Sequence, residues 1–500
     1  MRRWPTLFLL LFGCAGNAAV WAGDDPDFLK ALALQKVMQK TIRETEPAIA
    51  CILVSRSTLY QELGQGPDRL QLGKLGAFNP QVLHVSEEKR QHYRKLLDFT
   101  DPGYLPRAYG SGVVVDADGL ILTNYHVVQD ATKIFVRLPG GKSSYADIHA
   151  ADPRSDLAVL RLLNPAVRPL KTITLGNADK LDRGQFVLTL SNPFAAGFRD
   201  GQASASWGIL SNIRRRAPAH LKEDERIKPL QYYSTLLQTD ARLNLGCSGG
   251  ALCNLSGEMV GLITSVAAIQ GGETPGGFAV PVNTAMRRVI EVLQRGEEVD
   301  YGFLGVGFDG RTGSGDGNGR SGVVLQNLSG GGPAKRDGKL EEYDILVAID
   351  GQPIRDIDDV FAAVGSNLAG TKVRLQVRRG GIEHLAEVTL AKLYVPGPRI
   401  VSSIANRPYF HGLRVDYTSL LVQQPLVGTH DIHSIPSGVL VSEVQSNSSA
   451  ERAKLRAGDV ITHVNQMAVS APAAFYRAVT STRGPVELTL LGVPNRVLLK

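Results

Sequence analysis

The 500-residue sequence has few cysteines, few aromatic residues and no strong excess of either charge. Only four cysteines occur, so disulfide bonds cannot be the main brace of the fold, as they are in small secreted scaffolds. The formal net charge is +7 and is not gathered into one long tract. The sequence therefore gives no reason to predict a nucleic-acid partner.

Long hydrophobic runs and metal motifs are also missing. Beyond the N-terminal region, no run reaches the ~20 apolar residues that a membrane-spanning helix needs. No Cys-x-x-Cys or His-x-x-x-His pair with matching partners occurs, and the glycine clusters lack the strand, lysine and helix of a phosphate loop. We therefore predict no metal and no other cofactor.

The N-terminus has the three regions of a secretory signal. Two arginines follow the first methionine, an apolar run extends from Leu7 to Phe12, and small residues lead up to Ala22. We predict that residues 1–22 are a signal peptide and that the mature chain is exported, to the periplasm or the cell envelope. The alternative is a lipoprotein signal in which Cys14 carries a lipid anchor.

The exported part divides into a helical segment, a strand-rich region and a repeat. Residues 23–46 show apolar residues at helical spacing. Residues 47–283 alternate short apolar runs with turn signals such as Asp118-Gly119, which predicts a mainly β barrel or sandwich. A helix capped by Asn283 would close this region.

The rest of the chain contains one helix, turn and strand pattern twice. The stretches PAKRDGKLEEYDILVAIDGQPI and SAERAKLRAGDVITHVNQMAV align at a constant offset of 115 residues. Two modules of similar length are therefore predicted, joined by a proline-containing linker at 394–407. The aligned pairs are Leu340 with Leu455, Asp344 with Asp459, and Asp350 with Asn465.

Three residues of the strand-rich region could form a nucleophilic site. Serine needs a neighbouring imidazole to take its proton, and a buried carboxylate to fix the orientation of that imidazole. His126, Asp156 and Ser248 occur in the chain order of the chymotrypsin-like barrels. Cys247 directly precedes Ser248, and a thiolate is intrinsically the better nucleophile. The residue types alone leave open which of the two attacks.

The contexts of these residues resemble the HtrA (Deg) family of chymotrypsin-like serine proteases. LTNYHVV surrounds His126, SDLAVL surrounds Asp156 and LGCSGGAL surrounds Ser248, whereas the family motifs are similar to TNxHVV, DLAVL and GNSGGAL. The resemblance covers nearly the whole mature chain, because the family also carries one or two C-terminal PDZ domains.

The resemblance implies a mainly β fold with three domains. A chymotrypsin-like double β-barrel protease domain would occupy 47–298, followed by two small α+β, β-rich PDZ domains at 299–393 and 408–500. The implied function is an exported serine endopeptidase that cleaves unfolded or damaged proteins through an acyl-enzyme. Its subunits would assemble as trimers or multiples of trimers, with the PDZ domains recruiting C-terminal peptides.

The resemblance also assigns roles within the site. Ser248 would be the nucleophile, His126 the general base and then acid, and Asp156 its orienting carboxylate. The amides of Gly246 and Ser248 would form the oxyanion hole. Glycine suits this turn because it has no Cβ to obstruct the approach of its N–H to the developing charge.

The loop departs from the family pattern at two positions. Leu245 and Cys247 replace the usual proline and asparagine, so we expect a loop that is less firmly held. Cys247 is expected to be an inert thiol, and the alternatives are a disulfide to Cys253 or Cys51, or a redox-sensitive thiol. A non-hydrolytic chaperone or scaffold, with a loop that cannot form an oxyanion hole, is the alternative function.

The remaining predictions concern surfaces that contact peptides. Leu243, Ile263 and Ser265 fall where the family lines its substrate pocket, which implies a small or medium apolar pocket. The polar insertion at 55–109 corresponds to a long regulatory loop, and residues 191–210 to an activation loop. The PDZ peptide-binding loops would be Phe303, Leu304, Gly305 and Val306 in the first module, and Phe410, His411, Gly412 and Leu413 in the second.

Overall fold

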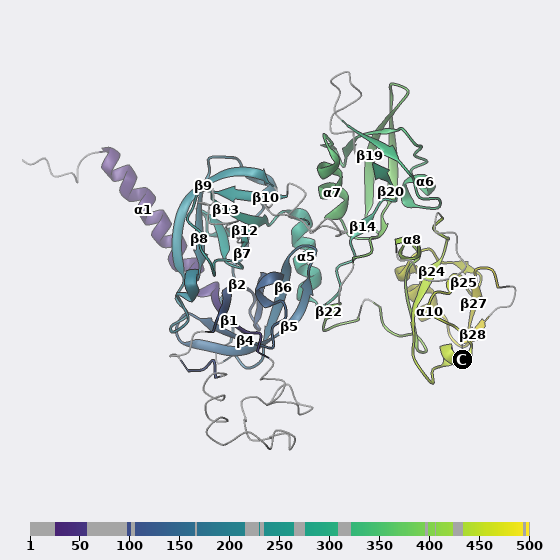
Figure 1. Ribbon diagram of the computed structural model, residues 1–500, viewed down its shortest axis with the longest axis horizontal. Coiled ribbons are helices and arrows are strands. Elements are labelled where there is room, and N and C mark those ends of the chain that lie inside the picture. The colour runs from purple at the N-terminus through teal and green to yellow at the C-terminus, as the bar shows by residue number, and fades with distance from the viewer. Residues whose placement is uncertain are drawn as a thin grey trace, which may run out of the picture.

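The computed structural model describes twelve stretches of the chain: residues 26–57, 98–101, 106–165, 168–215, 230, 235–264, 276–308, 322–395, 399–405, 407–423, 434–493 and 497–499. Three predicted features lie outside the described residues: the signal segment with Cys14, most of the insertion at 55–109, and Ser265. Figure 1 shows a body of two β-barrels and, beside it, two smaller modules at the C-terminal end of the chain.

The N-terminal helix α1 (Pro26–Thr45) lies against the barrels only at its C-terminal end and otherwise projects away from them (Figure 1). Its buried residues are Thr41 and Thr45, and the Thr41 hydroxyl donates to the carbonyl of Leu255 at 2.8 Å. Leu29, on the projecting part, is 51% exposed. The helix is where the sequence predicts it, but the apolar residues of its first turns are in solvent because the barrel ends before them.

The first barrel is an antiparallel sheet of six strands that closes on itself. Strand β5 pairs with both β4 and β6, which completes the ring. The predicted turn at Asp118-Gly119 joins β2 to β3, and Gly119 has a φ of 109°. The strands are β1 (Ile49–Ser55), β2 (Ala108–Asp116), β3 (Leu120–Asn124), β4 (Lys133–Leu138), β5 (Lys142–Asp152) and β6 (Leu157–Leu162).

The second barrel closes in the same way, because β11 pairs with both β8 and β12. The short strand β7 (Thr174–Leu175) adds to β12 in parallel. The strands of the second barrel are β8 (Phe186–Ser191), β9 (Ser204–Arg215), β10 (Leu236–Thr239), β11 (Ala251–Asn254), β12 (Glu258–Thr264) and β13 (Gly277–Pro281). The short helices of the two barrels are η2 (Glu46–Ala48), α4 (Tyr125–Val128), η4 (Ala178–Lys180) and η5 (Pro193–Ala195).

Helix α5 (Thr284–Gln294) follows the second barrel and packs against β5 and β6 of the first. The predicted cap is confirmed, since the Asn283 side chain accepts from the amide of Met286 at 2.8 Å. The inward face of the helix, including Val289, Ile290 and Leu293, is buried in the main hydrophobic core. The helix therefore ties the end of the double barrel to its beginning.

In the described residues, the two C-terminal modules share a six-stranded sheet, two helices at matching positions and a separate hydrophobic core, and the second module has one further short helix. The first contains β14 (Gly302–Phe303), β15 (Gly307–Phe308), β16 (Val323–Gln326), α6 (Pro333–Arg336), β17 (Ile345–Ile349), β18 (Gln352–Pro353), α7 (Ile357–Gly365), β19 (Lys372–Arg379), β20 (Ile382–Thr389) and β21 (Ala391–Lys392). The second contains β23 (Leu413–Tyr417), α8 (Leu420–Gln423), β24 (Val439–Val444), α9 (Ser449–Arg452), β25 (Val460–Val464), β26 (Met467–Ala468), α10 (Pro472–Ser481), β27 (Val486–Leu490) and β28 (Val497–Leu499).

The linker between the modules returns to the first barrel. Its short strand β22 (Ile400–Val401) pairs antiparallel with residues 150–151 of β5. The second module is joined to the linker and the first module by buried charges, since Asp416 lies 3.0 Å from Lys392 Nζ and 2.6 Å from Arg407 Nη1. Burial alone would raise the pKa of Asp416, but Lys392 and Arg407 outweigh it and hold that pKa below its ordinary value.

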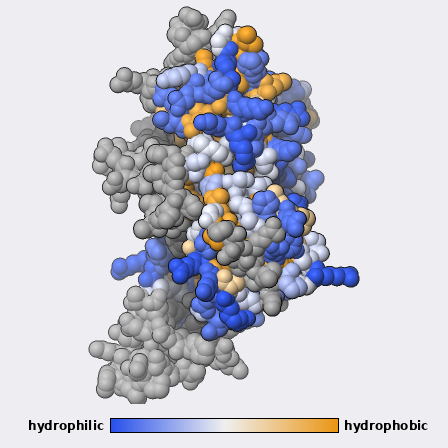
Figure 2. All heavy atoms as spheres, turned by 90° about the vertical axis from the view of Figure 1, so that its right-hand side faces the viewer, coloured by the Kyte–Doolittle hydropathy of each residue, from blue (hydrophilic) through white to orange (hydrophobic). Residues whose placement is uncertain are grey.

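The surface on the right-hand side of Figure 1 carries both hydrophilic and hydrophobic residues. Figure 2 views the molecule from its right-hand side in Figure 1 and shows abundant hydrophilic residues with small separate groups of hydrophobic ones. Within the described ranges, no helix combines the length and the apolar character needed to cross a membrane.

Candidate active site

The pairing of β3 with β6 brings His126 and Asp156 together. Asn124, at the end of β3, lies opposite Leu157, at the start of β6, so the residues just beyond them meet at the end of the barrel. His126 Nδ1 lies 2.8 Å from Asp156 Oδ2, and the His126 backbone amide donates to Asp156 Oδ1 at 3.0 Å. The carboxylate thus holds both the ring and the backbone of the histidine.

Asp156 is itself fixed from several directions. Its carbonyl accepts from the Tyr125 amide at 3.0 Å and from the Asn124 side chain at 3.1 Å. Its backbone has a φ of 57°, in the left-handed region where Asp is tolerated better than most residues. The Asp156 side chain is 7% exposed, whereas that of His126 is 42% exposed. The acid is therefore buried behind an imidazole that remains accessible to a substrate.

The Ser248 loop belongs to the second barrel but is bonded to the first. The Ser111 amide, on β2, donates to the Ser248 carbonyl at 2.7 Å, and the Ser111 hydroxyl donates to the Gly246 carbonyl at 2.7 Å. A Cβ added at Gly110 would lie 2.6 Å from the Val127 side chain and 3.3 Å from the Ser248 carbonyl oxygen. Ser248 therefore lies beside α4, the short helix that carries His126.

A hydrogen bond to the turn before Ser248 fixes the orientation of the Gly246 N–H. The Leu245 carbonyl accepts from the Phe194 amide at 2.7 Å, and a trans peptide places the next N–H on the opposite side. The Cys247 amide closes this turn onto the Asn244 carbonyl at 3.1 Å, with Gly246 at a φ of 96°. A Cβ on Gly246 would lie 2.6 Å from the Asn192 carbonyl oxygen, so only glycine fits.

Cys247 faces the interior of the second barrel. It is 2% exposed, packs in a hydrophobic cluster with Leu252 and Ile263, and its sulfur accepts from the Asn244 amide at 3.3 Å. The cysteines of the described chain are all free, so the disulfide alternative for Cys247 is not what the structure shows. Burial raises the pKa of the Cys51 and Cys253 thiols to about 12, which keeps both protonated near neutral pH.

The predicted pocket residues are only partly gathered at the site. Ile263 is fully buried, and its backbone bonds to Gly249 and Gly250 directly after Ser248, each at 2.8 Å. Leu243 packs at the border of the same hydrophobic cluster. Apolar side chains therefore lie directly behind the Ser248 loop, and the assignment of these residues to a substrate pocket stays a prediction.

The segment directly before β14, which joins the double barrel to the first module, reaches the loop in front of Asp156. The Tyr301 hydroxyl bonds to the Asp152 carboxylate, which also accepts from the Ser155 amide at 2.9 Å. Arg154 lies over the Tyr301 ring, 4.7 Å from its centre. Burial raises the pKa of the Asp152 carboxyl despite these bonds. Loop 152–156 is thus held by the module that follows the barrel.

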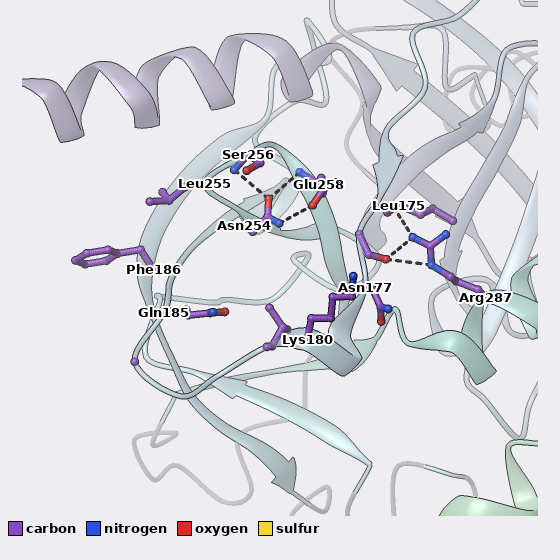
Figure 3. A pocket seen from close by; sticks show the side chains of 13 residues that line it. Leu175, Asn177, Lys180, Gln185, Phe186, Asn254, Leu255, Ser256, Glu258 and Arg287 are labelled. Carbon is purple, nitrogen blue, oxygen red and sulfur yellow. Dashed lines mark hydrogen bonds between the residues drawn. The ribbon is translucent and has the colours of Figure 1, made fainter. Parts of the chain in front are cut away.

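A cavity of about 580 Å³ lies on the second barrel (Figure 3), and its lining does not include His126, Asp156 or Ser248. Its lining includes Lys180, Phe186, Glu258 and Arg287, and Figure 3 shows Arg287 bonded to backbone carbonyls and Asn254 bonded to Ser256 and Glu258. Arg287, Asn254 and Glu258 are thus engaged with each other or with the backbone.

Sequence reasoning did not single out the residues that support the site. Ser111 binds both the Asn192 amide and the Gly246 carbonyl, and Phe194 offers only its backbone amide. Thr264, on β12, donates to Asp156 Oδ2 at 3.4 Å. A polar residue within an apolar strand, as in YGSGVVV, is the one signal that could have indicated Ser111.

Comparison with known proteins gives matches along most of the chain. A model of the trypsin-like peptidase domain matches residues 110–262, and PDZ domain models match 302–390 and 440–491.

The relatives include a probable periplasmic serine endoprotease DegP-like of Ectopseudomonas mendocina, 33% identical over 74% of each chain. The periplasmic pH-dependent serine endoprotease DegQ of Escherichia coli is 30% identical over 76% of this chain and 78% of its own. A solved structure, the HtrA-type protease AlgW with tripeptide, is 25% identical over 72% of this chain and 98% of its own, with a TM-score of 0.48.

Proposed function

The chain belongs to the HtrA (Deg) family and is a serine endopeptidase, and we propose that it is an exported protease that cleaves unfolded or damaged proteins through an acyl-enzyme. The observation that best supports this proposal is the hydrogen bond between His126 and the buried Asp156 on the first barrel. The Ser248 loop of the second barrel is hydrogen-bonded to β2 of that first barrel. A protein that only binds peptides has no need of this pair.

The proposed reaction begins with proton transfer. His126 takes the Ser248 hydroxyl proton as the serine oxygen attacks the scissile carbonyl, and the imidazolium that forms is stabilised by Asp156. The Nδ1 hydrogen bond to Asp156 fixes the tautomer that leaves Nε2 free to accept this proton. His126 then protonates the leaving amine, and water completes the cycle by the same route.

The negative charge on the tetrahedral intermediate needs donors that are already in place. We assign this role to the amides of Gly246 and Ser248. The support is the bond from Phe194 to the Leu245 carbonyl, which turns the Gly246 N–H to the side opposite Phe194. The bond from Phe194 forms with Leu245 and Cys247 in the loop, which supports this assignment over the chaperone or scaffold alternative.

Substrate selection is proposed to involve two separate surfaces. Leu243, Ile263 and Ser265 would favour a small or medium apolar residue before the scissile bond. The loop at Phe303–Val306 would hold the terminal carboxylate of a recruited peptide, which adds as a strand to the sheet edge. By family analogy the subunits form trimers or multiples of trimers, in the periplasm or cell envelope, with a lipid anchor at Cys14 as the alternative to a cleaved signal.

Labelling of the purified protein with a fluorophosphonate probe tests the proposal. We expect the probe to attach to the tryptic peptide that contains Ser248, and the label to disappear in Ser248→Ala. Cleavage of unfolded casein should be lost in the same variant and retained in Cys247→Ala. Casein cleavage that survives Ser248→Ala but not Cys247→Ala would assign the nucleophile to the cysteine, and a wild type that neither labels nor cleaves would favour the chaperone or scaffold.

A further inference from the structure

The peptide-binding loops of the two C-terminal modules occupy equivalent positions. The Leu304 carbonyl accepts from the Ala334 amide at 3.0 Å, and the His411 carbonyl accepts from the Ala450 amide at 3.1 Å. The glycine that follows each of them also accepts an equivalent bond, at 2.9 Å in the first module and 2.8 Å in the second. The loops can therefore be compared residue by residue.

The second loop is closed by hydrogen bonds between its own ends. The Leu413 amide donates to the Phe410 carbonyl at 2.9 Å, and the Phe410 amide donates to the Leu413 carbonyl at 2.8 Å. His411 and Gly412 have φ values of 51° and 83°, as in a two-residue type I′ turn. In the first loop, among the described residues, no backbone bond joins Phe303 to Val306, and only Gly305 has a positive φ.

This closure uses a donor that peptide binding requires. A PDZ-type site holds a terminal carboxylate with successive backbone amides of the loop. Leu413 supplies the last of these amides in the second module, and its N–H already points to the Phe410 carbonyl. A carboxylate could use it only after the turn had opened.

The groove beside the loop is also filled from within. Strand β23 lies at the edge of its sheet, where an added peptide strand would pair, and α10 packs against it. The Val415 amide, on β23, donates to the Tyr476 hydroxyl oxygen of α10 at 3.3 Å. This hydroxyl contact is specific to the second module, since the residue of α7 that matches Tyr476 is Phe361, which has no hydroxyl. The Phe361 ring instead meets the Phe308 ring edge to face, with the ring centres 5.7 Å apart.

A side-chain clamp holds the closed turn. Glu443 on β24 accepts from the Tyr409 hydroxyl at 2.5 Å and from Arg414 at 2.9 Å. The Arg414 guanidinium lies 4.0 Å from the centre of the Tyr409 ring. The residues directly before and after the turn are therefore fastened to the neighbouring strand.

We propose that the second module is closed to C-terminal peptides by its own residues, with the Phe410–Leu413 turn and the Tyr476 hydroxyl occupying the positions that a peptide would use. The inference rests on the proposed peptide recognition by the first module and confines that recognition to it. It replaces the sequence expectation for Phe410, His411, Gly412 and Leu413. The second module then serves as a brace, anchored through Asp416 to Lys392 and Arg407.

Hydrogen-exchange mass spectrometry of the full chain tests this assignment. The Ser248→Ala variant prevents cleavage of the probe, a decapeptide that ends in valine with a free carboxylate, and the same peptide with an amidated end is the control. We expect the free acid to protect residues 302–308 and to leave 410–417 unchanged, while the amide protects neither segment.

Two substitutions should open the second module. His411→Leu removes a residue that tolerates the left-handed conformation, and Tyr476→Phe removes the capping hydroxyl while keeping the ring. The double variant should protect 410–417 with the free-acid peptide and bind it there about tenfold more tightly, since each amide released from an internal bond becomes available to the peptide. The reciprocal variant Phe361→Tyr should weaken binding by the first module.

The outcomes separate the inference from the function on which it rests. Protection of 410–417 in the Ser248→Ala parent would overturn the closed second module while leaving recognition by the first intact. Protection of neither segment would overturn peptide recognition by the first module. A double variant that stays unprotected at 410–417, while the first module binds, would show that these two residues do not close the groove.

Discussion

The two barrels hold their shares of the active site by different means. In the first barrel, strand register positions the residues, since the pairing of β3 with β6 places His126 next to Asp156. In the second, the Ser248 loop depends on bonds from other segments, namely Ser111 on β2 and the backbone of Phe194. The acid and base thus lie directly beyond the ends of two paired strands, whereas the nucleophile loop is positioned by contacts that strand pairing does not dictate.

This contrast predicts a graded response to substitution. A change in the first barrel's pair should remove chemistry with little change in fold, because the surrounding ladder survives. A change around the loop should alter how well the amides are aimed. The following four substitutions are ordered from the largest expected loss to the smallest.

Asp156→Asn should have the largest effect. The amide retains the shape of the side chain but stabilises the wrong imidazole tautomer, so kcat should fall by roughly 10⁴. The melting temperature should change little, because the strand pairing of β3 and β6 is untouched. Hydrolysis of a chromogenic peptide measures the loss, and Asp147→Asn, on an exposed face of the same barrel, should leave kcat unchanged.

Gly246→Ala should follow, with a loss of roughly 10²–10³ in kcat, the usual effect of removing one oxyanion donor. The new methyl group would collide with the Asn192 carbonyl and so turn the Gly246 peptide. Gly140→Ala is the matched control, since Gly140 also has a positive φ of 80° but open space around its Cα. Equal kcat losses in the two variants would mean that backbone strain, and not the collision, is responsible.

Ser111→Ala should lower kcat by about tenfold, because the Asn192 amide and the Gly246 carbonyl each lose a buried partner. The free energy of unfolding should fall by ~1–3 kcal/mol. Ser144→Ala, which removes another buried hydroxyl of the first barrel, should cost stability but leave kcat unchanged. An unaltered kcat in Ser111→Ala would show that the loop does not need this bond to aim its amides.

Thr264→Val should have the smallest effect, a loss of about threefold in kcat. The Thr264 hydroxyl is the second barrel's contribution to Asp156, and at 3.4 Å its hydrogen bond is weak. Valine preserves the shape of the buried side chain. A loss above a hundredfold would contradict the comparison, because it would mean that the second barrel, and not the strand register, holds the acid.

Features with a local signature in the sequence are found where they were predicted. The cap at Asn283, the turn at Asp118-Gly119 and the module repeat all depend on short-range chemistry. The aligned residues Asp350 and Asn465 even make the same bonds, each accepting from a strand amide, at 2.8 Å and 2.7 Å respectively. Patterns of this kind can be read because a few neighbouring residues determine them.

Features that depend on distant segments could not be read in this way. The bond from Phe194 uses only backbone atoms, so no side chain in the sequence reports it. The replacement of Leu304 by His411 is visible in the sequence, but the positive φ of His411 and the contacts of Glu443 on either side of the turn are not. The same applies to α1, whose apolar residues fit a helix but gave no sign of how much of it the barrel would cover.

The short strand β22 has a consequence for truncated forms of the protein. By pairing with Ala150 and Ala151, it covers the outer rim of β5, which otherwise offers unsatisfied amides and carbonyls to any extended chain nearby. A form that stops after the first module would leave this edge of β5 unpaired, and two copies of it could associate by pairing their exposed edges. Solubility of the shortened protein would then depend on a dipeptide that takes no part in proteolysis.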